Sequence, residues 1–156
     1  MDLMSKKIKL LTAIFCVALP IAVAAGELPA IYKVAFDVGA QFYDYQNYQN
    51  IPYFHGGLDL CAPSGTDVYT PVSGRISVND YKIEASASPH RFSYRRTTFR
   101  RGTTSSTRYL EVAVIDEKGN NWMFRHIDPG SVPAEIFAAA ESGRAVAAGS
   151  KIGQVA

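Results

Sequence analysis

Two stretches of residues joined by a short turn constrain the fold of this chain most strongly. In "RYLEVAVID" (108–116), leucine and valine at the even positions alternate with tyrosine, glutamate and alanine at the odd positions. A period of two is typical of a strand with one buried face. The turn-forming sequence "EKGNN" follows, and "WMFRHID" (122–128) is predicted to return as a second strand that ends at His126. The sequence therefore predicts an antiparallel hairpin.

Most of the remaining chain also has β character. The segment "TDVYTPVSGRISV" (66–78) contains two short β-branched runs separated at Ser73-Gly74. One helical pattern is present, in residues 132–143, with Pro133 in its first turn and Gly143 as its stop. Residues 144–156 return to β, and no internal repeat is present. We predict an all-β domain with one short helix.

The first residues indicate where the protein is delivered. Three lysines precede an apolar run that begins at Leu10, and small residues lead up to Ala25. This order is typical of a secretory signal peptide. The apolar run contains Pro20 and is shorter than the roughly 20 residues of a spanning helix, so we expect no stable membrane anchor. We predict a signal peptide at residues 1–25 and one domain at 26–156, secreted or periplasmic.

Charge and cysteine content limit the classes of partner and linkage. Removal of residues 1–25 takes away three lysines and one aspartate, which brings the formal net charge from +2 to zero. A neutral extracytoplasmic protein is not expected to bind nucleic acid. Cys61 is then the one remaining cysteine, so no internal disulfide can form, and we expect its thiol to be buried.

Two segments have unusual composition. Residues 42–54, "FYDYQNYQNIPYF", combine aromatic rings with amides, which suits a half-buried edge or a groove wall. Residues 88–108 interleave arginines with aromatic residues and include His90. This segment either binds an anionic polymer or forms a solvated loop or long hairpin tip, in which arginine stems shield the aromatic rings. We favour the solvated loop or hairpin tip and expect His90 at the surface.

The sequence "HGGLD" places His55 and Asp59 four residues apart. Imidazole nitrogen and carboxylate oxygen are both zinc ligands, and two glycines between them allow a tight backbone turn. The spacing alone has low specificity, because a histidine beside a capping aspartate in a turn has the same pattern. The alternatives are therefore half of a metal site and an ordinary polar loop.

Several motifs in a fixed order add specificity. "HGGLDLCAPSGTDVYTPVSGRI" is followed by a hairpin ending in "WMFRH", a helix, and "GRAVAAGSKIGQV". From about His55 to Ala156 this order resembles peptidase family M23, the lysostaphin-like or LytM-type zinc metalloendopeptidases. The resemblance implies a mostly antiparallel sheet core with a groove and one short helix. It also implies hydrolysis of stem or cross-bridge peptides of peptidoglycan.

The resemblance also implies residue roles. His55 and Asp59 match the first two zinc ligands of the family, and His126 matches a catalytic histidine that is not a ligand. The alternative for His126 is a half-buried strand histidine that pairs with Asp128. Groove-lining residues are expected among the aromatic side chains, with Tyr53, Tyr69 and Trp122 as candidates.

One part of the family pattern is missing from the printed sequence. The third zinc ligand belongs to an H-x-H motif in a strand after "GSKIGQVA", and no such motif is present. We consider three explanations: the last strands of a longer enzyme are absent from this sequence, the protein is a non-catalytic module, or Asp128 or His90 substitutes as ligand. A non-catalytic module would bind peptidoglycan or a cell-wall amidase partner, and a last alternative is an unstable fragment.

Overall fold

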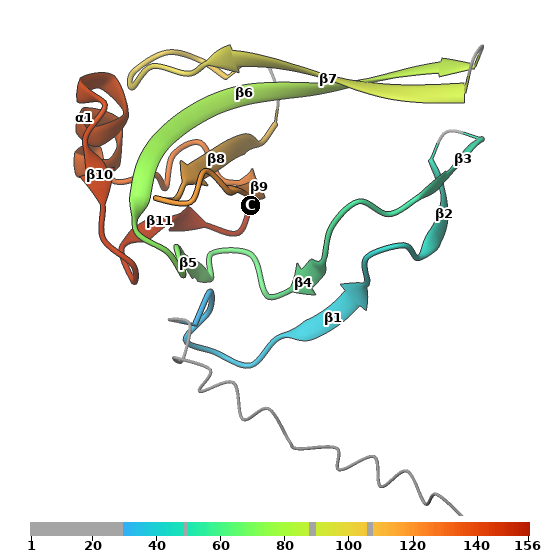
Figure 1. The fold of residues 1–156 in the computed structure, drawn as a ribbon, viewed down its shortest axis with the longest axis horizontal. Helices are drawn as coiled ribbons and strands as arrows, with labels where there is room; N and C mark the ends of the chain where they lie inside the picture. The colour runs from blue at the N-terminus through green and yellow to red at the C-terminus, as the bar shows by residue number, and fades with distance from the viewer. Residues whose placement is uncertain (1–29, 49, 88–89, 106–107) are drawn as a thin grey trace, which may run out of the picture.

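The computed structural model describes residues 30–156 except 49, 88–89 and 106–107, so the predicted signal peptide lies outside the described residues. The described chain is mostly antiparallel β-sheet with one short helix, which confirms the all-β prediction (Figure 1). Within these residues no helix is long and apolar enough to cross a bilayer. The strands are β1 (Asp37–Ala40), β2 (Tyr45–Tyr48), β3 (Ile51–Phe54), β4 (Asp59–Cys61), β5 (Asp67–Tyr69), β6 (Gly74–Ala87), β7 (His90–Thr98), β8 (Leu110–Ile115), β9 (Asn121–Ile127), β10 (Ala145–Val146) and β11 (Lys151–Gln154), and the helix is α1 (Ala134–Ser142).

The largest sheet has the order β10-β6-β8-β9, and β7 pairs with β6. The predicted hairpin is its β8–β9 pair, in which Val114 faces Trp122 and Leu110 faces Ile127. Strand β9 ends at Ile127, one residue beyond the predicted end. Three two-stranded sheets, β1–β4, β2–β3 and β5–β11, complete the domain.

One face of the large sheet forms the hydrophobic core. The even positions of β8, Leu110, Val112 and Val114, are fully buried. They pack against α1 and against the β5–β11 pair, from which Ile136 and Ile152 enter the same cluster. Burial of each such aliphatic side chain stabilises the fold by about 1.5–3 kcal/mol. The helix therefore covers the face of the sheet opposite to the odd positions of β8.

Two odd positions of β8, Glu111 and Ala113, are also buried, which differs from the predicted half-buried strand, whereas Ile115 at the end of the strand is exposed. Glu111 has an exposed fraction of 1% and Ala113 of 6%. Two arginines from neighbouring strands cover Glu111: Nε of Arg96 donates to Oε1 at 2.6 Å, and Nε of Arg125 donates to Oε2 at 3.0 Å. Since a buried carboxylate requires such partners, the three residues act as a polar clamp across β7, β8 and β9.

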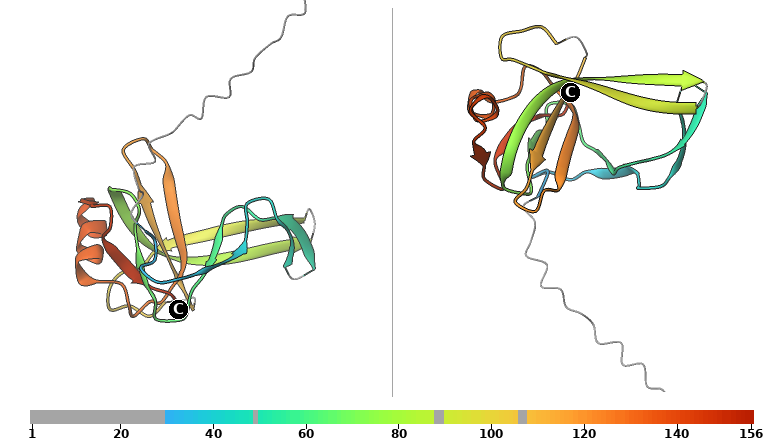
Figure 2. Two further views of the ribbon diagram at one scale, coloured as in Figure 1. Left: turned by 90° about the horizontal axis from the view of Figure 1, so that it is seen from below. Right: turned by 45° about the horizontal axis from the view of Figure 1, so that its top comes forward.

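The arginine-rich segment is largely strand, so of the two predicted forms it fits a long hairpin rather than a loop. Residues 90–98 form β7 and pair with β6 over nine positions, from Asn79–Thr98 to Ala87–His90. The resulting β6–β7 arm extends away from the core, and β3 contacts β7 (Figures 1 and 2). The side chain of His90 lies outside the described residues. Arg96 has a structural partner in Glu111 rather than an anionic polymer.

The predicted helix is confirmed as α1. Pro133 occupies the N-cap position in extended conformation, and Gly143 ends the helix with φ 68°, in the left-handed region that favours glycine. The amide of Gly143 donates to the carbonyls of Ala139 and Ala140. The helix is thus terminated by the residues that the sequence indicated.

Cys61 is exposed, in contrast to the predicted buried thiol. It is the last residue of β4 and pairs with Asp37 of β1, in a two-stranded sheet that packs little apolar surface. A Cβ atom at Gly39 would lie 2.6 Å from its sulfur, so this part of the sheet requires a glycine opposite the thiol. The apolar neighbours Leu60 and Ala62 were therefore a poor guide to burial.

We expect Gly74→Ala to destabilise the protein, because a Cβ atom there would lie 2.2 Å from the carbonyl oxygen of Ile115 in the paired strand β8. The backbone would have to move, at a cost of about 1–3 kcal/mol in the free energy of unfolding. Gly56→Ala is the matched control, since a Cβ atom there meets nothing within 4 Å. Urea unfolding of both variants tests the β6–β8 pairing, and equal stabilities would contradict it.

Candidate metal and catalytic site

His55 lies directly after β3, and its backbone is held by the turn that precedes β2. The amide of His55 donates to the carbonyl of Asp44 at 2.8 Å, and the amide of Tyr43 donates to the carbonyl of His55 at 2.8 Å. These bonds extend the β2–β3 ladder by one pair. Neither Gly56 nor Gly57 has a positive φ, and a Cβ atom would fit at both, so the glycines are not required for this turn.

The imidazole ring of His55 contacts two oxygen atoms. Its Nδ1 lies 3.1 Å from the carbonyl oxygen of Gln41, and its Nε2 lies 3.2 Å from Oδ1 of Asp59. A carbonyl oxygen can only accept a hydrogen bond, so Nδ1 must carry the proton. Nε2 of the neutral ring is then also an acceptor, and so is the Asp59 carboxylate. Their close contact requires a cation between them, either a second ring proton or a metal ion.

The His55–Asp59 geometry fits a shared metal ion. Ligand atoms at about 2.0–2.1 Å from a tetrahedral zinc ion are separated from each other by about 3.3–3.4 Å. The Nε2–Oδ1 separation of 3.2 Å is close to this value. A metal-binding histidine commonly donates its other ring nitrogen to a carbonyl group, as His55 does to Gln41. The pair predicted from sequence is thus brought together in a suitable orientation.

His126 lies at an irregularity near the end of β9. The register shifts between Leu110 and Val112, so Arg125 and His126 together oppose the single residue Glu111. His126 has φ 58°, a left-handed conformation that is uncommon for residues other than glycine. Bulges of this kind re-aim a side chain and are frequent beside active sites. The predicted regular strand position is therefore replaced by a bulge.

Two tyrosine rings flank the imidazole of His126. The Tyr109 and His126 rings have centroids 4.8 Å apart, and the Tyr81 and His126 rings 6.4 Å apart, both edge-on. Although the residue as a whole is exposed, these rings cover part of the imidazole. Burial is accordingly the main cause that lowers the pKa of His126, and the nearby Arg125 guanidinium lowers it further. A lowered pKa favours the neutral ring, which can accept a proton near pH 7.

Asp59 acts on both histidines of the site: it contacts His55 and affects the pKa of His126. Its carboxylate acts in the opposite direction on His126 and raises the pKa of that ring, although less than burial lowers it. The structure therefore places His55 and Asp59 in contact, whereas His126 is linked to Asp59 through this electrostatic effect.

A third protein ligand is not found in the described part of the chain. Among residues 30–156, with the gaps noted above, no three His, Cys, Asp or Glu side chains are grouped to hold a metal ion. Asp128, one predicted substitute, lies in a turn in which Gly130 donates to its Oδ1 at 3.4 Å. His90, the other, has no described side chain. The structure thus describes two of the three expected ligands.

The three aromatic residues expected to line a groove bond to or stack with other groups, and Tyr53 donates to Gln46 of the paired strand β2. Trp122 lies at the opposite end of β9 from His126 and donates to Asp116 at 3.2 Å. Tyr69 is on β5, where Lys33 stacks on its ring. Tyr81 and Tyr109 contact His126 instead. The alternating pattern of residues 108–116 places Tyr109 on the same face as Glu111, so the sequence could have indicated Tyr109. The position of Tyr81 beside His126 depends on long-range strand pairing.

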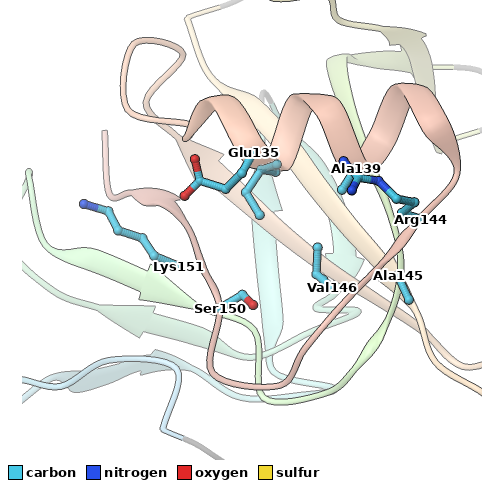
Figure 3. A pocket seen from close by; sticks show the side chains of 8 residues that line it. Glu135, Ala139, Arg144, Ala145, Val146, Ser150 and Lys151 are labelled. Atoms are coloured by element: carbon cyan, nitrogen blue, oxygen red, sulfur yellow. The ribbon is translucent and has the colours of Figure 1, made fainter.

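A hollow in the described structure is separate from this site. Its volume is about 340 Å³, and it lies between α1 and the segment that includes β10 (Figure 3). Glu135, Arg144 and Lys151 lie around it, and none of the three site residues lines it.

Comparisons of this chain with protein-family models, with curated proteins and with solved structures find no match. The functional interpretation accordingly depends on the geometry of His55, Asp59 and His126, and on the motif resemblance described above.

We expect Asp59→Asn to lower the pKa of His126 further, because it removes the one anionic group that raises that pKa. A proton NMR titration of the His126 ring in metal-free buffer measures the change. Asp128→Asn is the control, since Asp128 is two residues away in sequence but is not among the groups that shift this pKa. An unchanged His126 pKa in Asp59→Asn would mean that β4 and β9 do not meet at the site.

Proposed function

We propose that this protein is a secreted, zinc metalloendopeptidase-like protein that acts on the stem or cross-bridge peptides of peptidoglycan. The observation that supports this proposal most directly is the contact between Nε2 of His55 and Oδ1 of Asp59, which lie 3.2 Å apart. The same carboxylate raises the pKa of His126. The order of motifs from His55 to Ala156, which resembles family M23, supplies the substrate class.

His55 and Asp59 would hold the zinc ion in this proposal. The hydrogen bond from Nδ1 of His55 to Gln41 orients the ring and leaves Nε2 available as a ligand. Asp59 has an exposed fraction of 56% at its side chain, compared with 15% for His55, so the open side of the pair is the carboxylate side. Bound zinc supplies Lewis-acid polarisation of an amide carbonyl and an activated water.

His126 would move a proton during peptide hydrolysis. Its ring is held against Tyr81 and Tyr109 and is kept neutral by burial and by Arg125. A neutral imidazole accepts a proton from water and can then donate it to the leaving amine nitrogen. The bulge that turns His126 out of the regular strand leaves this ring accessible to a peptide.

The edge of β9 offers a place for a third ligand. Val155 forms a bridge with Ile127, and the amide of Ala156 donates to the carbonyl of His126 at 3.0 Å. Any strand that extends this pairing along β9 would place side chains beside His126. A ligand supplied there would bring the site to the three protein ligands of a catalytic zinc centre. With two ligands alone, zinc would be held weakly and hydrolysis would be impaired.

A second function is favoured by the ligand count. Since no third ligand accompanies His55 and Asp59 in the described residues, the same surface would also suit a non-catalytic module. Such a module would bind peptidoglycan peptides, or regulate a cell-wall amidase, without cleaving a bond. Metal content and cleavage distinguish the two functions.

We expect the purified protein to bind one zinc ion per chain, and His55→Ala and Asp59→Ala each to weaken zinc binding by at least about tenfold, since each removes one of two ligands. Isothermal titration with zinc measures the affinities. Glu117→Ala, at an exposed position in the β8–β9 turn, is the matched control and should bind as the wild-type protein does. If the protein binds peptidoglycan but takes up no zinc, the non-catalytic function is supported instead.

We expect His126→Ala to retain zinc binding but to lose hydrolysis. Removal of a general acid–base group costs about 10²–10⁴-fold in rate. Release of soluble peptides from purified peptidoglycan, with and without a chelator, measures the activity. Equal loss of zinc in His126→Ala would assign this residue to the metal rather than to proton transfer.

A further inference from the structure

An exposed cluster of aromatic rings adjoins His55. Four rings, here called the aromatic face, come from the β2–β3 hairpin and the turn that precedes it: Phe42, Tyr43, Tyr45 and Phe54. Their exposed fractions are 63%, 67%, 69% and 64%. Sequence analysis placed them at a half-buried edge or in a groove wall, and the structure exposes them instead. Contiguous exposed aromatic surface commonly marks a binding site.

The rings of the aromatic face touch one another in a continuous series. Phe42 and Tyr43 have centroids 4.5 Å apart, and Tyr43 and Phe54 6.0 Å. Tyr45 lies 6.1 Å from Phe54, which is its cross-strand partner in the hairpin. Each ring therefore limits the positions that its neighbours can adopt, and the face is a surface rather than four separate side chains.

The backbone fixes this surface. Tyr43 has φ 70°, an unusual conformation for a bulky residue, and its amide donates to the carbonyl of His55. The side chain of Asp44 accepts a hydrogen bond from the amide of Gln41 and closes the turn. Strained backbone of this kind is found at ligand-binding positions, where the surrounding structure maintains it. The aromatic face is thus pre-formed, which lowers the entropic cost of binding.

The chemistry of the hairpin indicates an uncharged ligand. Asp44 is the one charged residue in residues 41–54, where asparagine, glutamine and tyrosine supply the polar groups. A polyanion finds no cationic partner on this segment. Aromatic rings present an electron-rich face, against which the C–H groups of a pyranose ring can pack, while amides and hydroxyls bond to its hydroxyl groups. The composition therefore fits carbohydrate better than an acidic polymer or a charged peptide.

We propose that the aromatic face binds the uncharged amino-sugar rings of a glycan strand by stacking. The face is continuous with the candidate site, because Phe54 directly precedes His55, whose ring contacts Asp59. A glycan held there would direct its attached peptide toward His55, Asp59 and His126. The identity of the glycan as peptidoglycan rests on the proposed function, whereas the stacking surface does not depend on a metal.

Soluble oligomers of N-acetylglucosamine, which carry no peptide, are the probe for this surface. Isothermal titration of the purified protein should show saturable binding, and Tyr45→Ala and Phe54→Ala should each weaken it by about tenfold, as expected for loss of one stacked ring. Both rings are more than 60% exposed, so the variants should fold, which a thermal melt verifies. Ile115→Ala is the matched control, because Ile115 is an exposed apolar residue on β8, and it should bind normally.

The outcomes separate this proposal from the proposed function. A chelator should leave oligomer binding unchanged, so wild-type protein that binds the oligomers but takes up no zinc would oppose the zinc site alone. Absence of oligomer binding, or equal binding by wild type and both variants, overturns the carbohydrate surface. Self-association of the wild type that Phe54→Ala abolishes would assign the face to a second copy of the chain and also overturns it.

Discussion

The buried carboxylate of Glu111 is the constraint on which the arrangement of this domain depends. An ionised group with an exposed fraction of 1% is costly unless charged donors surround it. Arg96 of β7 and Arg125 of β9 supply these donors from either side, at 2.6 and 3.0 Å. The clamp therefore ties the long β6–β7 arm to the β8–β9 hairpin. It also seals the second face of β8, whose other face packs against the helix.

The site lies where this clamp meets an irregular strand. Arg125, which bonds to Glu111, and His126, which contacts Tyr81 and Tyr109, share the bulge opposite one residue of β8. Because Arg125 is held by a buried partner, the backbone at His126 has little freedom to return to a regular ladder. The same guanidinium helps to keep the His126 ring neutral. A group that stabilises the sheet thus also sets the orientation and the charge state of the candidate catalytic residue.

Sequence patterns predicted the elements whose structure depends on residues close together in the chain. The β8–β9 hairpin with its turn and the Pro133–Gly143 boundaries of the helix depend on near neighbours, and the structure confirms them, although it buries both faces of most of β8. The spacing of His55 and Asp59 was informative for the same reason. Burial of Glu111, exposure of Cys61 and the contacts of Tyr81 depend instead on pairing between distant strands. The arginine-rich segment, for which a loop and a hairpin tip were both considered, contains strand β7, and Arg96 of that strand pairs with Glu111 of β8.

The His55–Asp59 contact connects the candidate metal site to the aromatic face. Nδ1 of His55 donates its hydrogen bond to the carbonyl oxygen of Gln41. The Asp59 carboxylate can then approach Nε2 only with a second ring proton or a metal ion between them. Gln41 belongs to the same turn that holds Tyr43 and, through it, the aromatic face. Movement of that turn would therefore disturb the tautomer of His55 and the stacking surface together. A polymer made of sugar rings with attached peptides is a ligand that engages both parts at once, which gives a physical reason for one hairpin to carry them.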